Sequence, residues 1–241
     1  MTRCTKLLVK KINHMRNKIK ILWLLFSVTL IIQFVGNLLY FVVFNETHIV
    51  QLVYGVTKIT MLASPILFYF AGFKLPRFNL KHNISLSLIY GVITGLIMSG
   101  LILAIYFIFQ PFFGQFAPNI LIKIADFGIL KYYWPAAIVI SVLHSFFEEY
   151  YWRWYAVCGL STKMANLNSI LLGNFFFTLH HYIILSQFVP FYIAFLFGTC
   201  VGFGGVIWSH IYKRTGSLLG SWISHTLVDL CLFTIGYLLL N

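Results

Sequence analysis

Residues 84–109 read ISLSLIYGVITGLIMSGLILAIYFIF, a run of 26 residues without one charged side chain. A helix that crosses the hydrocarbon core of a bilayer needs about 20 consecutive, mainly apolar residues. Inside lipid, a helix satisfies all its backbone hydrogen bonds within the segment itself, which an irregular chain cannot do. The stretch therefore predicts a transmembrane helix.

Six other segments have a similar apolar character. They are Ile21–Phe44, Val50–Phe73, Trp134–Tyr155, Leu167–Leu185, Val189–Ile211 and Leu218–Leu240. Polar residues interrupt the third and fourth of these, which lowers their hydropathy. We predict an all-α, polytopic transmembrane bundle of seven helices. An eighth or re-entrant segment between Gln110 and Tyr133 is the alternative.

The composition excludes an ordinary soluble domain. Hydrophobic residues make up 60% of the 241 residues and charged residues only 9%, whereas soluble domains carry about 25% charged residues. We expect a basic segment over residues 1–20 and a single membrane-embedded helical domain over residues 21–241. The lipid bilayer is then the first partner of the chain.

The positive charge is placed asymmetrically along the chain. The net charge is +12, and the first 20 positions hold seven of the 17 basic residues: Arg3, Lys6, Lys10, Lys11, Arg16, Lys18 and Lys20. Basic residues beside an apolar helix mark its cytoplasmic end. In a seven-helix topology, the basic connections near Arg77, Lys163 and Arg214 fall on that same side. We predict a cytoplasmic N-terminus and no nucleic-acid partner, because no recognition motif accompanies the charge.

Acidic residues are few and are concentrated inside predicted helices. The chain has five, of which Glu148, Glu149 and Asp229 lie within such segments. A charged side chain at the bilayer centre costs about 2.5–3.5 kcal/mol on insertion scales and usually marks a functional site. The same segments hold four histidines: His144, His180, His181 and His225.

The spacing within residues 144–153 predicts different roles for the two adjacent glutamates. Glu149 and Arg153 are four residues apart, with the acid first, which favours an ion pair on a helix. Glu148 is turned about 100° away, and its neighbour one turn earlier is His144. We expect Arg153 to bind Glu149, and Glu148 to be free for general-base chemistry. Two acids that only lock helices together are the alternative.

Histidines on two further helices suggest a hydrolytic site. His180 and His181 are adjacent on one predicted helix, whereas His225 and Asp229 share a face of another. Water held between Glu148 and these imidazoles would be a plausible nucleophile, with Asp229 orienting His225 or the developing oxyanion. No HExxH, GxSxG or Gly-rich phosphate motif accompanies them.

Three motifs in order resemble the CPBP family, which includes type II CAAX endopeptidases and bacterial Abi proteins. They are Glu148-Glu149-Tyr-Tyr-Trp-Arg153, Phe177-Thr-Leu-His-His181 and His225-Thr-Leu-Val-Asp229. The resemblance extends from about Trp134 to the C-terminus, so residues 134–241 would form the catalytic core. It implies an intramembrane endopeptidase that cleaves a membrane-associated peptide or a CAAX-like protein. Bacterial members suggest a multi-pass protein of the bacterial plasma membrane.

The resemblance also assigns roles to the residues. Glu148 would activate water, while His181 and His225 would bind water or stabilise the transition state. Such enzymes have been described both as metal-free glutamate proteases and as metalloproteases. No cofactor is firmly implied; if a divalent metal such as zinc is present, Glu148, His181 and His225 would hold it.

Two positions depart from the family pattern. Phe176 with His180 fits the second motif as well as Phe177 with His181 does; we favour His181 because Thr178 then follows the motif Phe. Asp229 stands where CAAX enzymes of the eukaryotic type have Asn, which weakens the expectation of a prenylated substrate.

Two other functions fit the same polar residues. One is a bacteriocin-immunity or scaffold protein that binds a peptide without catalysis, as some bacterial relatives do. The other is a proton-coupled transporter, because intramembrane acids and histidines also form proton relays. A scaffold would not need Glu148 beside the Glu149–Arg153 pair, and no repeat of the transporter kind is detectable. The sequence does not indicate an oligomeric state.

Overall fold

The computed structural model describes residues 3–44, 47–126, 128 and 130–240, and the regular elements there are all helical. Among the basic residues at the start of the chain, the side chains of Arg3, Lys6, Lys10 and Lys11 lie outside the described residues, and so do those of Glu46, Lys123 and Asp126. Contacts divide the chain into unit 1, residues 1–74, and unit 2, residues 75–241. The single membrane-embedded domain predicted over residues 21–241 spans both units and stays a prediction.

Unit 1 is a helical hairpin. It consists of α1 (Arg3–Leu38), a π-helical turn η1 (Leu39–Val43) and α2 (Thr47–Phe70). The two helices approach closely at Gly36, where an added Cβ would lie 2.1 Å from Thr57 Oγ1. At the same level, Gln33 Nε2 donates a hydrogen bond to the Thr57 carbonyl at 3.3 Å. Helices with small and amide-bearing residues at their contact are typical of packing within lipid.

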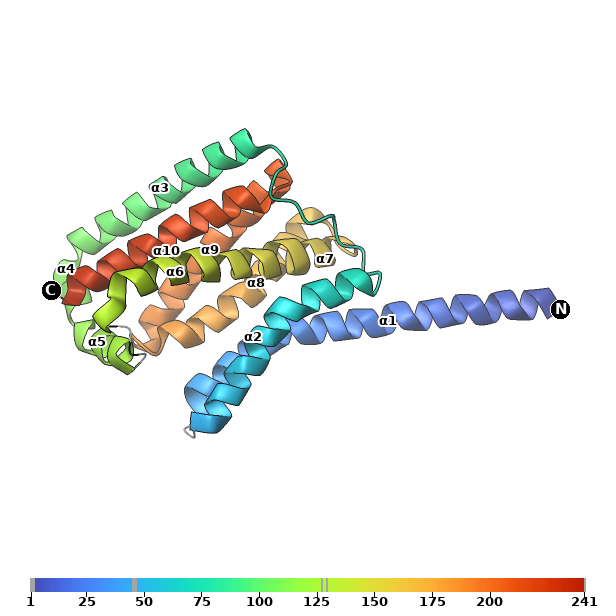
Figure 1. Ribbon diagram of the computed structural model, residues 1–241, viewed down its shortest axis with the longest axis horizontal. Coiled ribbons are helices and arrows are strands. Elements are labelled where there is room, and N and C mark those ends of the chain that lie inside the picture. The colour runs from blue at the N-terminus through green and yellow to red at the C-terminus, as the bar shows by residue number, and fades with distance from the viewer. Residues whose placement is uncertain (1–2, 45–46, 127, 129, 241) are drawn as a thin grey trace. The chain divides into compact units, whose positions relative to one another are not determined.

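Unit 2 contains the remaining helices, which Figure 1 shows as a bundle. In chain order they are α3 (Ile84–Ile108), α4 (Gln110–Gly114), α5 (Ala117–Asp126), η2 (Leu130–Tyr132), α6 (Tyr133–Glu149), η3 (Tyr150–Val157), α7 (Cys158–Ser161), α8 (Asn166–Leu185), α9 (Phe191–Thr215) and α10 (Leu218–Leu240). Helix α10 packs against α3, α6 and α9, and α8 packs against α9 and η3. The bundle therefore brings α6, η3, α8 and α10 around one interior.

Small residues allow α3 and α10 to touch along their backbones. An added Cβ at Gly91 would lie 2.6 Å from the Gly220 carbonyl oxygen, and one at Gly95 would lie 3.1 Å from the Ser224 Cα. Ser99 Oγ also donates to the Leu227 carbonyl at 3.1 Å. This contact holds α10, which carries His225, against α3.

Each of the seven predicted helices coincides with a helix of the structure. Among the described residues, five helices are long and apolar enough to cross a membrane: Met15–Val43, His48–Phe70, Ile84–Ile108, Phe191–Thr215 and Leu218–Leu240. The two others, α6 with η3 and α8, carry the glutamates and paired histidines that lower their hydropathy. Short helices α4 and α5 occupy the connection in which the sequence allowed an additional segment.

Candidate active site

The paired glutamates lie at the end of α6, where the α-helix continues as the π-helix η3. Both carboxylates are buried, and so is Arg153 on η3. Arg153 Nε donates to Glu149 Oε2 at 3.1 Å, which confirms the predicted ion pair. Single π-helical segments inside α-helices are frequent at functional sites, and here the segment directly follows the two acids.

The Arg153 guanidinium is held by more than its carboxylate. Arg153 Nη1 donates to Asn174 Oδ1 on α8 at 3.1 Å, and the guanidinium lies over the Phe177 ring at 4.5 Å. Asn174 Nδ2 in turn donates to Ser209 Oγ on α9 at 3.0 Å. A buried cation is tolerated only when it is paired and hydrogen-bonded. No motif spacing distinguishes Asn174, so its role was not predicted from the sequence.

Glu148 is surrounded by imidazoles from three helices. Its Oε1 lies 3.3 Å from His144 Nε2 on its own helix and 3.3 Å from His180 Nε2 on α8. Its Oε2 lies 3.7 Å from His225 Nε2 on α10. Among the described residues, no group donates a hydrogen bond to this second oxygen. Glu148 thus has one oxygen fixed by two imidazoles and one oxygen able to accept from another molecule.

His225 links the two glutamates. Its Nδ1 donates to Glu149 Oε1 at 3.0 Å, which directs Nε2 towards Glu148 Oε2. Asp229 Oδ1 also lies 3.6 Å from His225 Nε2, as expected from their spacing on one helical face. Glu149 therefore has two partners, Arg153 and His225, whereas the sequence predicted the first alone. It orients an imidazole as well as neutralising the arginine.

Both adjacent histidines of α8 lie beside Glu148. One ligand atom from each of Glu148, His180 and His181 falls within a span of 4.8 Å. His180 Nε2 contacts the carboxylate directly, whereas His181 Nδ1 donates to the Phe177 carbonyl at 2.9 Å. The motif register favoured His181 over His180 as the histidine that acts with Glu148. The structure brings both there, and the direct hydrogen bond belongs to His180.

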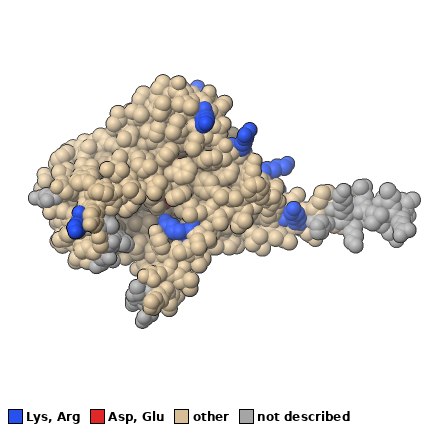
Figure 2. All heavy atoms as spheres, in the orientation of Figure 1, with Lys and Arg blue, Asp and Glu red and all other residues tan. Residues whose placement is uncertain are grey.

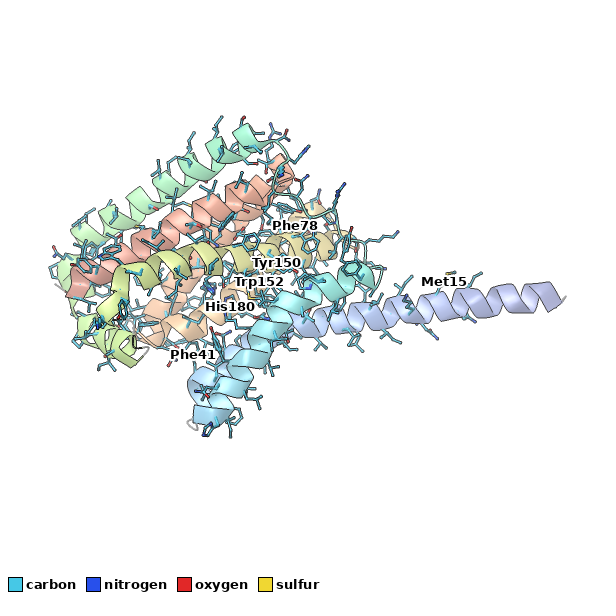
Figure 3. The ribbon with its side chains drawn as sticks, viewed as in Figure 1. Met15, Phe41, Phe78, Tyr150, Trp152 and His180 are labelled. Carbon is cyan, nitrogen blue, oxygen red and sulfur yellow. The ribbon has the colours of Figure 1, made fainter. Side chains whose placement is uncertain are left out.

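Two indole rings support the site imidazoles from behind. Trp208 on α9 stacks on His225 with ring centroids 3.9 Å apart and planes 12° apart. Trp152 on η3 lies parallel to His180 at 5.6 Å, and the two rings are labelled beside each other in Figure 3. Trp208 Nε1 also donates to Ser224 Oγ at 3.0 Å. Trp208 belongs to no motif, and Trp152 occupies a position of the first motif to which no role was assigned, so neither contact was predicted from the sequence.

The site residues suit a divalent metal such as zinc. Carboxylate oxygen and imidazole nitrogen are common zinc donors, and Glu148, His180 and His181 offer three of them within reach of one another. The His181 Nδ1 bond to a backbone carbonyl leaves Nε2 for a ligand, as in many metal-binding histidines. The set predicted from sequence had His225 in place of His180.

Comparison with known proteins gives a family match over part of the chain. No curated protein and no solved structure matches it. Residues 130–231 match a family model described as Rce1-like, type II CAAX prenyl endopeptidase. The match runs from η2 into α10 and covers every site residue described above. It agrees with the CPBP resemblance of the three motifs: over residues 130–231 the chain is similar to the Rce1-like type II CAAX endopeptidase family.

Proposed function

We propose that the protein is an intramembrane endopeptidase in which Glu148 activates water to hydrolyse a peptide bond. One observation carries the proposal: a buried carboxylate contacts imidazoles from α6, α8 and α10, while the neighbouring carboxylate is occupied by Arg153 and His225. A pair of acids serving only to lock helices would not leave one of them ringed by histidines. The family match to an endopeptidase supports the same chemistry.

The chemistry starts with water bound at Glu148 Oε2. Glu148 takes a proton from this water while the water oxygen bonds to the carbonyl carbon of the substrate, as general-base catalysis requires. The negative charge then develops on the carbonyl oxygen. His225 in its protonated form, held through Nδ1 by Glu149, donates from Nε2 to that oxygen. Glu148 finally delivers its proton to the amine as the carbon–nitrogen bond breaks.

A metal would fit this scheme at Glu148, His180 and His181. When bound, such an ion would polarise the attacking water or the substrate carbonyl. The protein residues keep their own tasks in either case: Glu149 orients His225, and Arg153 balances the charge of Glu149.

The substrate that suits the site is a membrane-associated peptide or a lipid-linked protein tail. The site lies between helices whose outer surfaces are apolar, so a substrate held in the same bilayer reaches it by diffusion in two dimensions. Asp229 beside His225 adds an acid near the oxyanion position. This placement favours substrates other than those of the Asn-containing CAAX enzymes.

Replacing Glu148 tests the proposal directly. Glu148→Gln keeps the shape of the side chain and removes the base, so we expect cleavage to fall at least about 100-fold. The thermal unfolding midpoint should stay close to that of the wild type. Cleavage of a membrane-peptide library by the purified, reconstituted chain, followed by mass spectrometry, provides the assay. Full turnover by the Glu148→Gln variant would refute the role of Glu148.

A further inference from the structure

The exposed charge of unit 2 gathers at one end of the bundle. Apart from the buried Arg153 and the half-buried Lys213, the described basic side chains there are all exposed, and all but Lys131 lie near the start of α3, α8 and α10. We call four of them the basic rim: Arg77, Lys81, Lys163 and Arg214. In Figure 2, the drawn face shows blue basic atoms at several places and no red acidic ones.

Hydrogen bonds hold the segments of the basic rim together. In the connection before α3, the Asn79 carbonyl accepts from Leu218 N at 3.2 Å, and the Leu80 carbonyl accepts from Ser217 Oγ at 3.0 Å. Trp154 Nε1 donates to the Pro76 carbonyl at 2.8 Å. These bonds place Arg77 and Lys81 beside the turn between α9 and α10, where Arg214 lies.

The turn between α9 and α10 lets His82, in the connection before α3, approach the backbone closely. Gly216 has φ of 69°, a left-handed conformation that glycine adopts without strain. An added Cβ there would lie 2.8 Å from His82 Cδ2. On the other side, Lys213 Nζ donates to Asn166 Oδ1 at 2.7 Å, which joins the end of α9 to the start of α8 near Lys163. The rim is thus a defined surface made from three connections.

Within the described residues, no acid forms an ion pair with Arg77, Lys81 or Arg214 of the basic rim. The described carboxylates of Glu148 and Glu149 are buried, and Asp229 lies beside them in the site. The rim also adjoins exposed aliphatic side chains at the start of α3, such as Ile84 and Leu86. A cationic surface bordering apolar helix faces has the chemistry of the boundary between lipid headgroups and acyl chains.

We propose that the basic rim binds the phosphate groups of anionic phospholipids. An acidic protein partner would need charge alone, whereas the adjoining aliphatic surface matches a molecule with both phosphate and acyl chains. Trp154, at the level of the rim, follows Glu148 by six residues along α6 and η3. Bound lipid headgroups would hold the polar cluster at that depth. The proposal does not depend on peptidase chemistry.

Lipid retention by variants of the full chain tests the proposal. The protein is purified from nanodiscs that contain phosphatidylcholine and a minority of phosphatidylglycerol, and the retained lipids are measured by native mass spectrometry. Each basic residue near an anionic surface contributes about 1 kcal/mol, which corresponds to about fivefold in binding. We expect Arg214→Gln to reduce phosphatidylglycerol enrichment about fivefold, and Arg77→Gln/Lys81→Gln/Arg214→Gln to abolish it.

Lys131→Gln is the matched control, because Lys131 carries the same charge away from the rim. Its enrichment should equal that of the wild type. The basic segment at residues 1–20 is present in every variant, so differences report the rim alone. Circular dichroism and the unfolding midpoint confirm that each variant is folded. If Arg214→Gln and Lys131→Gln lose equal enrichment, or if neither loses any, the rim is not a lipid site.

Two further measurements distinguish phospholipid from free inorganic phosphate as the group that binds the rim. Raising the ionic strength to about 1 M shortens the screening length to about 3 Å, so enrichment should fall sharply. At constant ionic strength, free inorganic phosphate should not displace phosphatidylglycerol, because it lacks acyl chains. Equal displacement by free phosphate, or rim variants that weaken only the binding of an acidic peptide, would overturn the proposal. The inactive Glu148→Gln variant should retain lipid normally.

Discussion

Adjacent glutamates can carry out different tasks when their partners differ. Glu149 accepts hydrogen bonds from Arg153 and His225, both of which are buried. It therefore neutralises the arginine and also orients the imidazole that takes part in the proposed chemistry. Glu149→Gln should leave the Arg153 charge unbalanced and lower the free energy of unfolding by about 3 kcal/mol. It should also reduce cleavage, because His225 loses its orienting carboxylate. Denaturation and activity measured on one preparation would check both effects.

Glu148→Gln is the comparison variant for Glu149→Gln. Glu148→Gln should lose activity with a nearly unchanged unfolding midpoint, whereas Glu149→Gln should lose both. If the two variants behave identically, the division of roles between the acids is incorrect.

The paired histidines, His180 and His181, provide a second test of the roles of single residues. The preference for His181 in the motif would make His181→Ala far more damaging than His180→Ala. The contacts now lead us to expect losses of about 100-fold or more for both, because His180 bonds Glu148 and His181 lies within the same cluster. Cleavage rates normalised to protein level would be compared with His210→Ala, since His210 is exposed on α9.

Metal content measured on the same variants distinguishes the two mechanisms. In a metal-dependent enzyme, zinc bound by the wild type would be lost from both His180→Ala and His181→Ala but kept by His210→Ala. Full activity of His180→Ala with an inactive His181→Ala would restore our original preference for His181.

Trp208 is expected to position His225 without touching substrate. Trp208→Leu removes the stacked ring and the donor to Ser224, so kcat should fall about 10- to 100-fold, as for supporting residues around other sites. KM should change little, and Trp208→Phe should recover part of the rate by restoring a ring. Trp134, partly exposed at the start of α6, offers a control substitution. A change confined to KM would exclude the positioning role.

At the scale of the element, the contact between α3 and α10 determines where His225 lies. Gly91→Ala would place a methyl group against the Gly220 carbonyl and should destabilise unit 2 by about 1–3 kcal/mol. Gly100→Ala lies on the same helix with open space around it and should be neutral or stabilising by up to about 1 kcal/mol. Thermal unfolding of both variants in one detergent would be measured. Equal losses would mean that backbone contact does not hold α10.

Sequence periodicity predicted the helices and many of the site contacts for physical reasons. Apolar length marked the spans, and four-residue spacing on one helix predicted the Glu149–Arg153, His144–Glu148 and His225–Asp229 contacts. Contacts between helices were not predictable, because they depend on rotation and packing. Examples are the bond of Glu149 to His225 and that of Arg153 to Asn174. The π-helical segment η3 was also missed, since its residues have no distinctive pattern.

At the scale of the whole molecule, the asymmetry of charge predicts the orientation of the chain. The rim should face the cytoplasm and Lys131 the opposite side. Arg214→Cys and Lys131→Cys would be introduced separately into a chain with Cys4 and Cys200 changed to Ala. An impermeant maleimide should label Lys131→Cys in intact cells and Arg214→Cys only in permeabilised ones. Labelling of both from the outside would contradict the seven-helix topology.

The indole rings beside the imidazoles of the candidate site give the protein an optical property. Two of its six tryptophans, Trp152 and Trp208, lie parallel to His180 and His225. Indole emission is quenched by contact with a protonated imidazole, so the intrinsic fluorescence of the chain carries a signal from the interior of the bundle. Protonation, ligand entry or a shift of α10 would each alter that emission. Trp152 and Trp208 are therefore intrinsic fluorescent probes of the proposed active site.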